Sequence, residues 1–147
     1  LAGLVGGAVM SMLLYAGIAM APRQMKMNLF YLLGTMMLPA GAMVYVAGAM
    51  MHGMMSVVFG LIHTGLYQAF SIESGLWAWG LVFGLLHWMV VGVGMGMMGV
   101  MHPRIRSGEV GAPGAFVKNY PGMTVMGFLM LHLVYGLLVG VVYEAII

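Results

Sequence analysis

Four long apolar stretches divide the chain, and short polar segments separate them. The stretches cover residues 1–21, 40–70, 76–101 and 121–147. Each has at least the roughly 20 residues that a helix needs to cross the hydrocarbon core of a bilayer. The pattern therefore predicts an all-α fold, in which a single domain is an integral membrane bundle of four transmembrane helices.

A fifth apolar run, residues 29–38, is too short to be a span. It lies between Asn28 and Pro39, and about ten helical residues cannot cross roughly 30 Å of hydrocarbon. We expect a short interfacial or re-entrant helix with Asn28 as its N-cap. A five-span alternative divides residues 29–70 near Gly53, but it requires a turn inside an apolar run.

Composition narrows the class of protein. Of 147 residues, 63% are apolar, five are basic and three are acidic, and the mean hydropathy is +1.07. A soluble enzyme, a nucleic-acid binder and a disordered tail are excluded, because soluble domains carry about a quarter charged residues. The chain has no cysteine, which excludes disulfides and thiolate metal sites.

All five basic residues fall in the two loops 22–28 and 102–120. Four spans place both loops on one side, and the positive-inside rule makes that side cytoplasmic. We expect the longer loop to contact lipid headgroups or a partner protein. The residues expected to make this contact are His102, Arg104, Arg106 and Lys118.

Three spans each carry a histidine near their middle: His52, His87 and His132. At about 1.5 Å per residue they lie ~18, ~21 and ~17 Å from the cytoplasmic side, and so at similar depth. His63 lies on the helix stripe of His52, 11 residues later. Polar groups at this depth usually face the bundle interior. These four residues are candidate ligands for haem, chlorophyll or a metal ion, although separate hydrogen bonds between helices would also explain them.

Two further interpretations use the same region of the second span. Met50 and Met54 lie within about a turn of His52, and thioethers suit Cu(I), so His52, Met50 and Met54 are a candidate copper site. Methionine as a flexible filler of apolar cores is the alternative. A ladder of Tyr45, His52, His63 and Tyr67 would instead suit a conductor of protons or small solutes.

Groups for catalysis are scarce. The only carboxylates are Glu73, Glu109 and Glu144, and no two of them pair for general acid–base chemistry. We therefore expect a protein that is not an enzyme. The leading hypothesis is a non-catalytic accessory subunit of a larger respiratory or photosynthetic membrane assembly, in contact with lipids and other membrane subunits.

Several short segments resemble a known group of proteins. These segments are residues 25–38, 101–104, 119–122 and 132–140. Together they resemble small, uncharacterised bacterial four-helix inner-membrane proteins of the domain-of-unknown-function type. The resemblance implies a helical membrane bundle from a bacterium, and it implies no activity.

Overall fold

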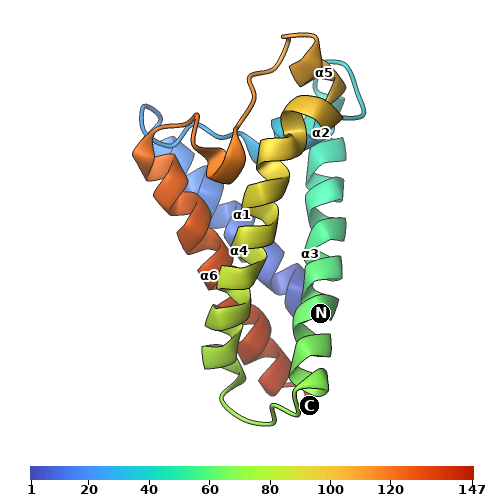
Figure 1. Cartoon of the computed structure of the whole chain (residues 1–147), viewed down its shortest axis with the longest axis vertical. Helices are drawn as coiled ribbons and strands as arrows, with labels where there is room; N and C mark the ends of the chain where they lie inside the picture. The colour runs from blue at the N-terminus through green and yellow to red at the C-terminus, as the bar shows by residue number, and fades with distance from the viewer.

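The computed structural model describes residues 1–147 and is a bundle of four long helices (Figure 1). They are α1 (Ala2–Met20), α3 (Met43–Ala69), α4 (Leu76–Met101) and α6 (Gly122–Glu144). Each is long and apolar enough to cross a membrane. The predicted all-α bundle of four spans is confirmed, with helix ends within three residues of the predicted ones.

The five-span alternative is wrong. α3 continues without a turn through Gly53, where that alternative needed a break. Nothing lies within 4 Å of a Cβ built on Gly53, so this glycine is on the outer face of the helix. A single glycine weakens a helix by only about 1 kcal/mol relative to alanine, and the surrounding apolar residues keep the span intact.

The short helix begins where it is expected. α2 (Leu29–Gly34) has Asn28 as its N-cap, and the Asn28 side chain accepts a hydrogen bond from the backbone N–H of Tyr31 at 3.1 Å. The Tyr15 hydroxyl donates a second bond to the same oxygen at 2.9 Å. The cap therefore also ties α2 to α1.

α2 ends at Gly34, four residues before the predicted end. The Thr35 hydroxyl donates back to the carbonyl oxygens of Tyr31 and Leu32, and such bonds to the preceding turn compete with helix continuation. Gly34 also lies directly against the carbonyl group of Val44 on α3, where no larger side chain fits. α2 is thus packed into one end of the bundle.

Glycine pairs set the closest helix contacts. The four pairs spaced four residues apart are Gly3/Gly7, Gly80/Gly84, Gly92/Gly96 and Gly136/Gly140. Gly3/Gly7 contacts α3, and the pairs Gly80/Gly84 and Gly136/Gly140 contact each other's helices, α6 and α4. Gly92/Gly96 contacts the short 3₁₀ helix η1 (Ala115–Val117). Every pair is used inside the chain, where small residues let backbones approach.

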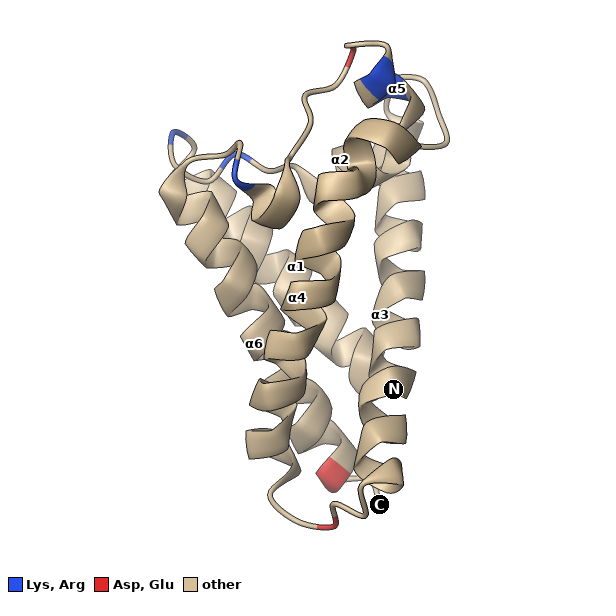
Figure 2. Ribbon diagram, viewed as in Figure 1, with Lys and Arg blue, Asp and Glu red and all other residues tan.

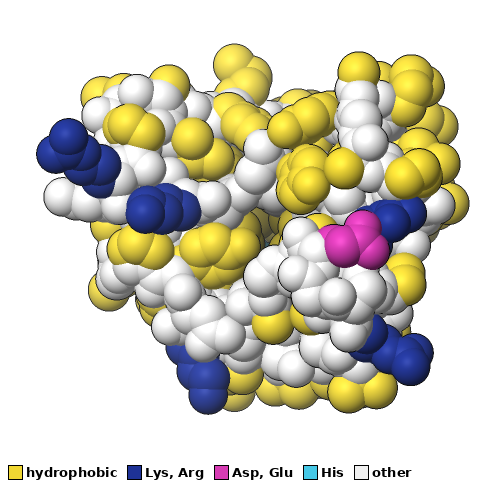
Figure 3. All heavy atoms as spheres, turned by 90° about the horizontal axis from the view of Figure 1, so that it is seen from above, with side chains coloured by type: hydrophobic (Ala, Val, Ile, Leu, Met, Phe, Trp, Pro, Cys, Tyr) yellow, Lys and Arg dark blue, Asp and Glu magenta, His cyan; other side chains and the backbone are white.

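The two ends of the bundle differ in the charge of their side chains. All Lys and Arg residues lie at the end that holds α2, the short helix α5 (Pro103–Arg106) and η1, whereas Glu73 and Glu144 lie at the opposite end (Figure 2). Figure 3 shows the basic side chains spread around the rim of their end, with apolar side chains between them. We refer to it as the basic end.

Candidate functional site

A cavity of about 50 Å³ lies inside the bundle, between the basic end and the middle of the spans. α1, α3, α4 and α6 line it, together with residues 27–33. Its polar lining consists of His52, Ser56, His87, His132 and Tyr135. The three histidines predicted at similar depth thus line one cavity. The volume suits a few water molecules or one ion, since a water needs about 10–15 Å³ on this measure.

His132 on α6 lines this cavity, and its hydrogen bond fixes which ring nitrogen carries the proton. The side chain is 2% exposed, and its Nδ1 lies 2.6 Å from the carbonyl oxygen of Phe128. A carbonyl oxygen can only accept, so Nδ1 carries the proton. Nε2 therefore keeps its lone pair and has no hydrogen-bond partner in the protein.

His52 on α3 has the same tautomer for a different reason. Its Nδ1 lies 3.1 Å from the hydroxyl of Ser11 on α1, and that hydroxyl donates its only proton to the Gly7 carbonyl at 2.9 Å. With its proton on Gly7, the hydroxyl accepts from Nδ1–H. His52 is left with an unprotonated Nε2.

His87 on α4 is the least satisfied of the three. Its ring lies 4.8 Å from that of His132, nearly perpendicular at 83°, and it stacks on Phe59 at 3.7 Å between ring centres. Its buried Nδ1 has no hydrogen-bond partner. A buried polar atom without a partner is costly, so a ligand that bound it would stabilise the folded chain.

His63 lies one ring further from the basic end and does not line the cavity. It is 1% exposed, its ring centre is 5.7 Å from that of His87, and neither ring nitrogen has a hydrogen-bond partner. It packs edge-on against Tyr135 at 5.6 Å. His63 therefore lies next to the other predicted ligands, as the prediction requires, but it does not line the cavity that they share.

The predicted copper site of His52, Met50 and Met54 is wrong. Met50 and Met54 are 67% and 70% exposed, on the outer face of α3. Each is two residues from His52, and two residues turn a helix by about 200°, which places the thioethers opposite the imidazole.

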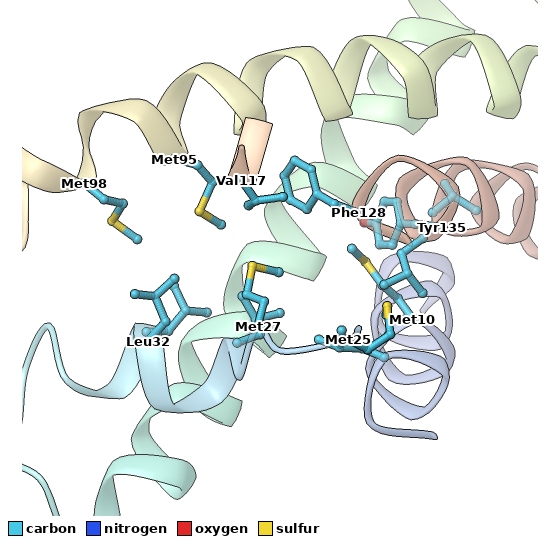
Figure 4. Close-up of a cluster of buried hydrophobic side chains, with 14 of the residues drawn as sticks. Met10, Met25, Met27, Leu32, Met95, Met98, Val117, Phe128 and Tyr135 are labelled. Carbon is cyan, nitrogen blue, oxygen red and sulfur yellow. The ribbon is translucent and has the colours of Figure 1, made fainter. Parts of the chain in front are cut away.

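Other methionines do reach the cavity, and none of them is among the predicted ligands. Met10, Met27 and Met95 line it and are 3–7% exposed; Figure 4 shows Met95 reaching from α4 toward Met27. A signal for Met95 is present in the sequence, because His87, Val91 and Met95 are spaced four residues apart and share a helix face.

The donor types limit which ions the cavity suits. No group of three side chains among His, Cys, Asp and Glu is arranged to hold a metal ion. A metal site here would have to combine imidazole nitrogens with thioether sulfurs.

The predicted ladder for protons is not continuous. Tyr45 is 44% exposed and packs on Tyr31. Tyr67 donates its hydroxyl to the Leu76 carbonyl at 3.0 Å, and His63 makes no hydrogen bond. Proton transfer needs a connected chain of donors and acceptors, which these residues do not form.

The predicted role of His102 in lipid or partner contact is also wrong. The side chain is 0% exposed. Its Nδ1 accepts from the backbone N–H groups of Arg104 and Ile105, so that it caps α5, and its Nε2 lies 3.0 Å from the Leu32 carbonyl oxygen. Since Nδ1 accepts, Nε2 carries the proton and donates to Leu32.

Arg104 also has its partners within the chain. Its guanidinium donates to the Leu38 carbonyl at 2.9 Å and forms an ion pair with Glu109 at 3.2 Å. Hydrogen bonds from the Ser107 hydroxyl and from Arg104 hold the pKa of the Glu109 carboxyl below its usual range. Arg106 and Lys118 are exposed and form no ion pair, so they remain available for contact with lipid or another protein.

Comparison with known protein families, curated proteins and solved structures finds no match. The resemblance to small bacterial four-helix membrane proteins therefore stays a prediction without a family to support it, and the functional argument depends on the cavity alone.

Proposed function

We propose that this chain is an integral membrane protein that binds a soft monovalent metal ion, Cu(I), in the cavity lined by His52, His87 and His132. One observation carries the proposal: His52 and His132 both use Nδ1–H in a hydrogen bond and leave Nε2 unprotonated. Histidines that bind metals almost always donate their other nitrogen in this way, which fixes the tautomer and the ring.

The donors around the cavity favour copper in its reduced state. Imidazole nitrogen and thioether sulfur are neutral, and soft thioethers select Cu(I) among the common metals. A divalent ion would bring two charges into a site that no thiolate or carboxylate lines. The cost of burying charge without a counter-charge is smaller for a monovalent ion.

A tetrapyrrole is disfavoured by size. Pockets for ligands of drug size or larger typically enclose about 300–1,000 Å³, and this cavity has about 50 Å³. Haem or chlorophyll would have to separate the helices that carry the three imidazoles. The residues present do not fit either group inside the bundle.

The test is a competition for Cu(I). The full chain is purified in mild detergent and titrated, under reducing conditions, against a colorimetric Cu(I) chelator. We expect one bound ion per chain, and at least about tenfold weaker binding in His87→Phe and His132→Phe, since even outer-sphere changes at metal sites cost about 10–100-fold.

His63→Phe is the matched control, because His63 is a buried imidazole next to the cavity but does not line it. Its affinity should stay within about threefold of that of the unaltered chain, with the helix content of all variants unchanged by circular dichroism. Failure of the unaltered chain to withdraw Cu(I) from the chelator would contradict the proposal. So would equal affinities of His132→Phe and His63→Phe.

The orientation of the chain is part of the proposal. The basic end is assigned to the cytoplasm of a bacterial inner membrane, because positively charged loops are retained on that side. The spread of basic side chains around its rim (Figure 3) suits a ring of anionic lipid headgroups better than a single anionic ligand.

The role of non-catalytic accessory subunit stays a prediction and is compatible with metal binding. Mild-detergent purification from the native membrane, followed by mass spectrometry, would identify partner subunits if the chain has them.

A further inference from the structure

We infer that the buried methionines between the cavity and the basic end form a path by which Cu(I) enters the histidine cavity. This inference rests on the proposed function. The methionine path consists of Met10, Met25, Met27, Met95 and Met98. These are all the buried methionines of the chain, and they belong to one contiguous cluster (Figure 4).

The outer part of the path lies directly under the basic surface. In the extended segment after α1, successive side chains point in opposite directions: Met25 and Met27 are 8% and 3% exposed, whereas Lys26 between them is exposed. The segment is fixed to α6, because the Lys26 N–H donates to the Thr124 hydroxyl at 3.2 Å. That hydroxyl in turn donates to the carbonyl of Gln24 at 2.7 Å.

Two glycines make room for the first thioether. The methyl carbon of Met25 lies 3.2 Å from the Cβ position of Gly17 on α1 and 3.0 Å from that of Gly127 on α6. Met25 thus fills a gap between these helices. It does not line the cavity.

The inner part of the path is continuous with the site. Met10, Met27 and Met95 line the cavity together with the three histidines. Met98 lies one turn beyond Met95 on α4, toward the basic end, and Figure 4 shows both side chains extending from that helix toward Met27 and Leu32. The cluster therefore reaches from the outer segment to the imidazoles.

The buried methionines lie on only one side of the cavity, toward the basic end. Beyond the cavity, toward the acidic end, the buried cluster consists of Tyr67, Leu76 and Phe83, with His63 beside it. None of these side chains has a sulfur. Cu(I) that entered from the basic end would therefore meet thioethers first and imidazoles last.

The chemistry suits transfer. Thioethers are neutral and weak ligands on flexible side chains, so Cu(I) can pass from one to the next by ligand exchange without redox change or proton release. The imidazoles, which are stronger donors, would retain the ion at the end.

The test separates rate from affinity. Met25→Leu and Met98→Leu remove sulfurs that do not line the cavity, and Leu for Met nearly conserves volume. The full chain in detergent is loaded with Cu(I) from a weak chelator, and the loading rate is measured by stopped flow. We expect this rate to be at least about tenfold lower in the double variant. Its equilibrium affinity should change less than about threefold.

The control is the double variant Met50→Leu and Met54→Leu on the outer face of α3, which should load at the unaltered rate. If the chain binds Cu(I) but the Met25/Met98 variant loads as fast as this control, the path is overturned and the proposed function stands. If affinity falls as much as rate, the two thioethers belong to the binding site, and the path is again overturned. If the unaltered chain binds no Cu(I), the proposed function itself fails.

Discussion

Gly136 on α6 lies directly against the backbone of Gly80 on α4. A Cβ on Gly136 would overlap the Gly80 carbonyl oxygen and come within 2.8 Å of the Gly84 Cα. Because these neighbours are backbone atoms, they can move away only if the helices separate. We expect Gly136→Ala to lower stability by about 1–3 kcal/mol, the usual cost of overpacking, measured by unfolding in mixed detergent micelles.

Gly94→Ala is the control for that variant. Nothing lies within 4 Å of a Cβ at Gly94, and alanine is the better helix former by about 1 kcal/mol. Its stability should stay the same or rise. Equal destabilisation of the two variants would show that the tight contact between α4 and α6 has no special cost.

His102→Leu should loosen the basic end. The change removes the acceptor for two backbone N–H groups of α5 and the donor for the Leu32 carbonyl. Buried groups left without partners cost about 1–3 kcal/mol. Hydrogen exchange should accelerate in Leu29–Gly34 and Pro103–Arg106. Arg106→Gln, at an exposed position without an ion pair, should leave both segments as protected as before.

The loop that follows α5 should depend on pH. The pKa of Glu109 is lowered in the folded chain by the Ser107 hydroxyl and by Arg104. The interaction therefore adds stability at pH values above the usual glutamate pKa and loses it as the pH falls through the lowered pKa. A carboxyl NMR titration of Glu109 should give a midpoint below the usual value, and Ser107→Ala should move it upward. An unchanged midpoint in that variant would contradict the assignment of the main cause to the hydroxyl.

Topology can be tested independently of function, because the chain has no cysteine. Ala112→Cys at the basic end should react with a membrane-impermeant maleimide only from the cytoplasmic side. Both Ala112 and Ser74 are exposed, at opposite ends of the bundle. Ser74→Cys should therefore react only from the other side, and the reverse pattern would overturn the assigned orientation.

The spans and the depth of the histidines could be predicted because each depends on local sequence. Hydropathy defines a helix that crosses a bilayer, and counting residues from its end gives depth. The N-cap at Asn28 is equally local. The residue spacing also shows that the copper site predicted at Met50 and Met54 was wrong, since a separation of two residues from His52 places the side chains on opposite helix faces.

Other features depend on contacts between distant parts of the chain. His102 is a polar residue in a basic loop, and its burial depends on Leu32 and Thr35, 70 and 67 residues earlier. The tautomer of His52 depends on Ser11 in another helix. Met25 and Met27 lie in a polar segment by composition. Met25 is buried because it packs between α1 and α6, and Met27 is buried because it lines the cavity.

Because all four glycine pairs are used inside the chain, larger side chains, many of them methionines, are left to face the surroundings of the bundle. Its outward methionines keep many rotamers against fluid acyl chains, and immobilising one costs up to about 1.5–2 kcal/mol in lost side-chain entropy. Among them are Met12, Met50, Met54 and Met126, at 71%, 67%, 70% and 59% exposed. A rigid protein neighbour would have to overcome this cost at each methionine that it covers, whereas fluid lipid would not.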